Sequence, residues 1–211
     1  MDSLNLGDLK SPDTERRAKA WHELQKLIES GKDLRKYRLY FRSLLWYPLQ
    51  GVRESAWEHL QVYKTVGVTG IEKAFSSSSD RIKLTAWQHA KEALSLGLVD
   101  SGQLSKLTPH FWRLLRSYFP TVRKKAWNLL PTLIEMGIVE RNDGSRLIEF
   151  LRSKKVGVRI LAWSKVRILM ERGILDEEQV KQNFQYLVEM TEKDSLASRR
   201  AKKILGEFGW T

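Results

Sequence analysis

The dipeptide Ala-Trp occurs five times in this chain, and each tryptophan is followed ten residues later by a glycine. The tryptophans are Trp21, Trp57, Trp87, Trp127 and Trp163, and the glycines are Gly31, Gly67, Gly97, Gly137 and Gly173. The tryptophans are 36, 30, 40 and 36 residues apart, and a weaker sixth copy follows 39 residues later with Lys202 in the tryptophan position. An internal repeat of this length limits the chain to folds built from stacked, similar units.

Within each copy the apolar residues follow the period of a helix. In the fourth copy they are Val122, Ala126, Leu130 and Leu133, at steps of four, four and three residues. Such steps trace one face of an α-helix, and the glycine that follows is typical of a left-handed residue at its end. Pro131 lies inside this segment and is expected to bend it, because proline lacks the N–H that the helix uses.

A second apolar segment precedes each of these helices, so every copy is predicted to be a helix pair. These first segments are expected at Asp2–Leu9, Asp33–Trp46, Gly70–Phe75, Ser101–Phe119, Asn142–Arg152 and Asp176–Thr191. Polar residues after the glycines, such as Asp100 and Asp176, are natural N-caps for the next helix.

The predicted fold is therefore all-α, a right-handed α-solenoid of about six antiparallel helix pairs forming a single domain over residues 1–211. The approximate repeats are 1–31, 32–67, 68–97, 98–137, 138–173 and 174–211.

The composition narrows the class of protein further. There is no cysteine, which excludes disulfides and thiolate-bound metals, and no apolar run approaches the roughly 18–20 residues that cross a bilayer. The N-terminal residues lack the pattern of a signal peptide. We therefore expect a soluble, cytoplasmic protein without a membrane partner. The net charge of +12 is spread along the chain, which suits an anionic partner.

The sequence Val-Arg-x-x-Ala opens the second helix at Val52, Val122 and Val158. This pattern resembles the HEAT repeat, and the likeness covers essentially the whole chain. The resemblance implies a curved solenoid that acts as a scaffold or binding surface. A subset that resembles alkylpurine DNA glycosylases uses such repeats to cradle duplex DNA.

HEAT repeats commonly carry an aspartate eight residues before the position of the tryptophan here, and that aspartate pairs with the arginine of the repeat. The first copy has Asp13 there, but copies two to five hold Leu49, Ser79, Phe119 and Lys155. Their basic residues therefore either find other structural partners or bind an anion at the positive start of a helix. Further cations flank them without any demand from the repeat. The candidate anion-binding or partner-binding residues are Arg53, Lys83, Arg123, Lys124, Lys125, Arg159, Arg199 and Arg200.

The tryptophans also allow two interpretations, as a platform for stacking bases or as packing between repeats. Their constant phase beside a small alanine favours packing. In the middle copies the exposed phase of the second helices is expected at Glu58, Gln88, Asn128 and Ser164.

No catalytic pattern is present in the sequence. There is no glycine-rich phosphate loop, and His22-Glu23 begins a zinc-protease motif that Lys26 breaks. We therefore expect no catalytic residue, metal, cofactor or small-molecule substrate. A glycosylase-type repair enzyme is kept only as a minor alternative, because no acidic residue is singled out by its repeat position.

The predicted function is a non-enzymatic HEAT-repeat scaffold or adaptor that binds a macromolecule through a basic face. The alternative is sequence-nonspecific binding of nucleic acid through its phosphates. The sequence leaves open whether the partner is an acidic protein or a nucleic acid, and it leaves the oligomeric state open.

Overall fold

The computed structural model describes residues 5–210, and every regular element in that range is a helix. The prediction of an all-α protein is confirmed. The first expected segment began at Asp2, and its residues before Asn5 lie outside the described part. Contacts divide the chain into two compact units, residues 1–111 (unit 1) and 112–211 (unit 2). The boundary falls within α7 (Ser101–Leu115), and the single domain stays a prediction.

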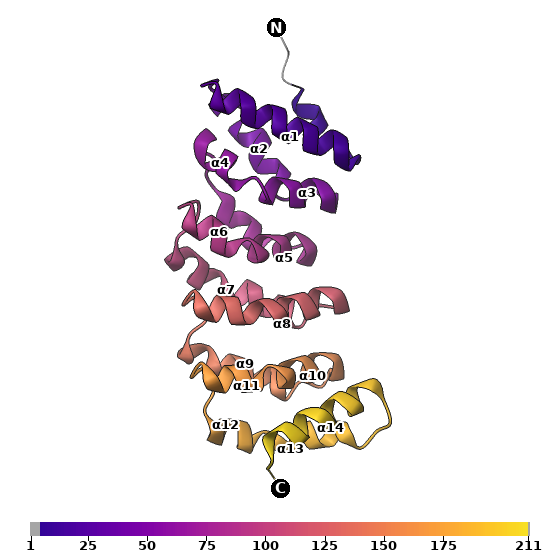
Figure 1. Ribbon diagram of the computed structural model, residues 1–211. Coiled ribbons are helices and arrows are strands. Elements are labelled where there is room, and N and C mark those ends of the chain that lie inside the picture. Colours follow the sequence, from indigo (N-terminus) through magenta and orange to yellow (C-terminus); the bar gives the residue numbers. More distant parts are fainter. Residues whose placement is uncertain (1–4, 211) are drawn as a thin grey trace. The chain divides into compact units, whose positions relative to one another are not determined.

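Unit 1 contains alternating short and long helical segments (Figure 1). The second segments of its copies are α1, α3 and α5, and α3 packs against both α1 and α5. The elements are η1 (Leu6–Lys10), α1 (Thr14–Glu29), η2 (Arg35–Tyr37), α2 (Arg38–Leu44), α3 (Gln50–Trp57), α4 (Leu60–Val66), η3 (Ile71–Ser76), α5 (Asp80–Gln88) and α6 (Ala90–Ser95).

Unit 2 follows the same alternation. Its α10 packs against α8, α9 and α14, and α8, α10 and α14 carry the second segments of the last three copies (Figure 1). The elements after α7 are α8 (Pro120–Glu135), η4 (Arg141–Asp143), α9 (Gly144–Leu151), α10 (Val156–Ser164), α11 (Val166–Glu171), α12 (Glu177–Gln182), α13 (Phe184–Val188), η5 (Glu189–Thr191) and α14 (Leu196–Phe208).

The five repeated tryptophans are part of the buried core, each no more than 1% exposed. The prediction that they are packing residues is confirmed. In four of them the indole Nε1 donates to the backbone carbonyl twelve residues earlier, at 2.8–3.1 Å. Trp127, for example, donates to Leu115 at the end of α7. This bond ties the second segment to the end of the first within one copy.

The predicted helix ends are also confirmed. All five repeat glycines have φ between 71° and 85°, in the left-handed region that closes a helix. Asp176 caps α12 by accepting from the Gln179 N–H at 2.8 Å, and Asp100 does the same for Gln103 in α7.

The second segments of copies two, three and five depart from the expected single helix, and the expected first segment Asp176–Thr191 is likewise divided, into α12, α13 and η5. These second segments break just after the tryptophan, into α3 and α4, α5 and α6, and α10 and α11. In contrast, α8 runs through Pro131 without interruption.

Candidate binding groove

The repeat arginines bond to the backbone of the turn that precedes their own helix. Arg17, Arg53, Arg123 and Arg159 each donate to the carbonyl six residues earlier, at 2.7–2.9 Å. These carbonyls lie in the turns between segments, one to three residues beyond the preceding helix. In copies two, four and five they accept from the arginine whose expected aspartate is missing.

Two of the predicted site cations also face acidic side chains, at positions other than the one that the HEAT-repeat resemblance implies. The Lys83 Nζ lies 3.7 Å from Asp80 Oδ1, and Arg159 Nη1 lies 3.2 Å from Glu189 Oε2. Lys83 and Arg53 are each only 3% exposed. Burial lowers the pKa of the Arg53 guanidinium. An outside anion would reach Arg53 and Lys83 only by displacing the groups around them.

In unit 1, the two repeat arginines also donate hydrogen bonds to side chains of the next copy. Arg17 Nε donates to Ser55 Oγ at 2.8 Å, and Arg53 Nε donates to Thr85 Oγ1 at 3.0 Å. Both hydroxyls stand two residues before the tryptophan of the following copy. A hydroxyl at this position thus completes the arginine's hydrogen bonds.

Arg123 lies in the same register but lacks this last bond. A Cβ added to Gly157 would lie 2.8 Å from Arg123 Nη2, just as one added to Gly51 would lie 2.9 Å from Arg17 Nη2. Leu161 stands where the hydroxyl would be, and Arg123 Nε is buried without a hydrogen-bond partner among the described residues.

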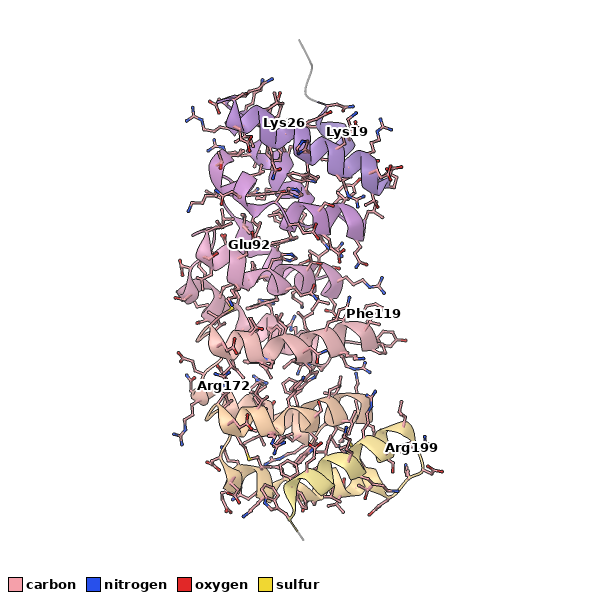
Figure 2. All side chains as sticks on the ribbon, in the orientation of Figure 1. Lys19, Lys26, Glu92, Phe119, Arg172 and Arg199 are labelled. Carbon is pink, nitrogen blue, oxygen red and sulfur yellow. The ribbon has the colours of Figure 1, made fainter. Side chains whose placement is uncertain are left out.

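Two of the flanking cations are brought together by the structure. Lys124 on α8 and Arg200 on α14 line one groove, together with Lys203. Lys125 and Arg199 are exposed but are not among the residues that line it. Figure 2 shows Arg199 at the N-terminal end of α14.

The groove has a volume of about 320 Å³ and lies along α10, with α8 on one side and α14 on the other. We call Lys124, Arg200 and Lys203 the groove cations. The groove floor is Ile160, Leu161 and Ile204. Asn128, Ser164 and Glu207 complete the lining, so three cations face one carboxylate.

One further lysine, Lys165, contacts a residue that lines the groove. Lys165 Nζ donates to Asn128 Oδ1 at 3.0 Å, which holds the Asn128 amide in place. Burial lowers the pKa of Lys165. The groove thus combines charged, amide, hydroxyl and aliphatic groups over three helices.

The corresponding positions in unit 1 have a different character. Lys124 stands three residues before its tryptophan, and Asn128 stands one residue after it. In copy two these positions hold Glu54, in α3, and Glu58, which directly follows α3. The basic groove is therefore a feature of unit 2 and does not repeat with every copy.

Sequence reasoning missed Lys203 and the groove floor, although it placed Asn128 and Ser164 on the exposed phase, where the structure has them. Lys203 follows Lys202, the residue in the tryptophan position, so it belongs to that same phase. The repeat register was the signal that would have found it.

Other chemistry has little support in the described residues. Across residues 5–210 no three His, Asp or Glu side chains are grouped so as to hold a metal ion. His59 and His89 stack on Trp21 and Trp57, with ring centroids 4.4 and 5.7 Å apart. None of the described helices has the length and apolar character of a membrane span.

The chain matches no model of a known protein family, and it matches no curated protein.

Proposed function

We propose that this chain is a HEAT-like, right-handed α-solenoid of about six helix pairs that works as a non-enzymatic binding scaffold. The repeated tryptophan-to-carbonyl bond and the left-handed glycines support the repeat architecture. Within each unit the second segments pack in succession: α1 packs with α3 and α3 with α5, and α8 packs with α10 and α10 with α14. Stacking of this kind is how helical repeats bury their apolar faces.

The working surface in this proposal is the basic groove of unit 2. The observation that carries it is the convergence of the groove cations from α8 and α14 on a groove with one acid. Like charges held close together repel each other, so such a cluster is favourable only when an anionic partner meets it. The proposed partner is therefore a macromolecule with negative charge.

Retention on immobilised heparin, a generic polyanion, tests this proposal. We expect the variant with Lys124→Ala, Arg200→Ala and Lys203→Ala to elute at clearly lower salt than the wild type. The exposed charges that remain in this variant are scattered, and salt screens scattered charges more readily than a cluster.

The matched control removes three exposed helical lysines from unit 1, Lys19, Lys26 and Lys64 (Lys19 and Lys26 are labelled in Figure 2). This control has the same net charge as the groove variant, and we expect it to elute close to the wild type. Equal shifts in the two variants would contradict the proposal, since retention would then follow net charge and not the groove.

A further inference from the structure

The groove in unit 2 presents two kinds of surface at once. Its rim carries the groove cations, and its floor is aliphatic, with Leu161 and Ile204 partly exposed and Ile160 5% exposed. We infer that the groove binds an acidic peptide segment that inserts one large apolar side chain between α8 and α14. This inference rests on the proposed function and names the class of partner.

The size of the groove fits a side chain and its flanking backbone. A volume of about 320 Å³ is at the lower end of ligand pockets, which hold roughly 300–1,000 Å³. One leucine or phenylalanine covers such a floor and excludes water from it. The Asn128 amide and the Ser164 hydroxyl stand on the same lining, where the polar groups of a peptide backbone would pass.

A nucleic acid would use only half of this surface. Its phosphates would meet the groove cations, but the backbone has no apolar group for the floor. The residues that line the groove include no aromatic ring on which a base would stack. Aliphatic floor and basic rim together are complementary to an acidic, partly apolar peptide.

The charges along α14 also give the peptide a direction. Arg200, Lys203 and Glu207 follow one another along the groove side of the helix. Acidic residues of the peptide are attracted near Arg200 and repelled near Glu207. The segment that follows the apolar anchor toward Glu207 should therefore be neutral or basic.

Fluorescence anisotropy with the full chain tests the inference. The probe is a fluorescein-labelled peptide with glutamates on both sides of a single leucine, so that the glutamates on the Glu207 side report its repulsion. Its twin has an alanine in place of the leucine. A single-stranded oligonucleotide of the same charge is the third probe. We expect the leucine peptide to bind tightest, because only it covers the floor.

Three variants separate the contributions of rim, floor and polarity. Removing the three groove cations should weaken binding of the leucine peptide on the order of tenfold, because each exposed ion pair contributes only a little to the affinity. Ile204→Ala should weaken it on the order of tenfold and leave the alanine twin unchanged. Glu207→Gln should tighten binding by roughly two- to fivefold. A gain of affinity cannot result from damage to the fold.

Several results would overturn the inference. Equal binding of the leucine and alanine peptides, or no effect of Ile204→Ala, would mean that the floor takes no part. Tighter binding of the oligonucleotide would assign the groove to nucleic acid. If the peptides do not bind while retention on heparin still depends on the groove cations, the inference fails and the proposed function stands. If the peptides do not bind and retention on heparin does not depend on the groove cations either, the proposed function is rejected as well.

Discussion

At the scale of the residue, Arg123 shows what one missing hydroxyl does to an otherwise constant arrangement. It donates to the carbonyl six residues earlier, that of Ser117, as the other repeat arginines do, but its buried Nε has no partner among the described residues. Leaving a buried donor without a hydrogen bond costs about 1–3 kcal/mol, because its hydration is lost without replacement. Leu161 stands at the position of the accepting hydroxyl, and its side chain has no acceptor atom.

Leu161→Thr should restore that bond, since Thr85 accepts from Arg53 at the equivalent position. Valine has nearly the same shape without the hydroxyl, so Leu161→Val is the matched control. We expect the threonine variant to have a free energy of unfolding roughly 0.5–1 kcal/mol higher than the valine variant. Urea denaturation measures the difference. Identical midpoints would mean that the hydroxyl does not reach Arg123.

The arginines also mark what the sequence could and could not tell about single residues. The repeat identified Arg53 and Arg123 and showed that they lack the expected aspartate. It could not show that backbone carbonyls take its place, because every residue has a carbonyl and none is marked by residue type. Lys124 and Arg200 were named as candidates, but their meeting in one groove depends on how α10 separates α8 from α14.

At the scale of the element, the glycine at the end of each second segment has a purely conformational role. At Gly137 the φ angle is 72°, and an added Cβ would meet no heavy atom within 4 Å. Space is therefore not what requires glycine here. The left-handed backbone, which is unfavourable for other L-residues, requires it.

Gly137→Ala should lower the free energy of unfolding by about 1–2 kcal/mol, the cost of a left-handed alanine. Gly206 is the matched control, because it lies inside α14, and an added Cβ there also meets nothing within 4 Å. Gly206→Ala should raise the free energy of unfolding by roughly 0.5–1 kcal/mol through helix propensity. Thermal or urea denaturation of both variants measures the pair. If both change stability in the same direction, the conformational explanation is wrong.

Helix ends were predictable from glycine and from the aspartate caps, but the breaks inside the second segments were not. At two of them a histidine stands at the break, and its Nδ1 bonds the carbonyl four residues earlier: His59 with Ser55 at 2.6 Å, and His89 with Thr85 at 2.9 Å. A side chain that bonds this carbonyl competes with the helical N–H for it. Copy five breaks at Lys165 without a histidine, so no single residue type announces the break.

At the scale of the whole molecule, the excess of positive charge has two parts. Much of it is scattered, and several exposed cations face nearby acids, as Arg172 faces Glu135 at 3.1 Å. The three groove cations are different, because the groove that they line contains a single acidic residue, Glu207. The even spread of charge along the sequence therefore conceals a local cluster that only the packing of unit 2 creates.

This cluster should make the free protein less stable at low ionic strength. We expect the triple alanine variant of the groove cations to melt about 2–4 °C above the wild type at about 0.01 M salt, where repulsion is poorly screened. At about 1 M salt, where the screening length is only about 3 Å, the gap should close. Differential scanning calorimetry at the two salt concentrations measures it.

The control with Lys19, Lys26 and Lys64 replaced carries the same number of helical Lys-to-Ala or Arg-to-Ala changes, so gains in helix propensity largely cancel between the two variants. Its lysines lie on α1 and α4 and do not share a groove lining with the cations of unit 2. A smaller shift in the control, together with a gap that closes at high salt, would show that the groove holds repelling charges in the free chain. A difference in melting temperature that persists at high salt would instead indicate a change in packing. The argument from charge repulsion for an anionic partner of the groove would then fail.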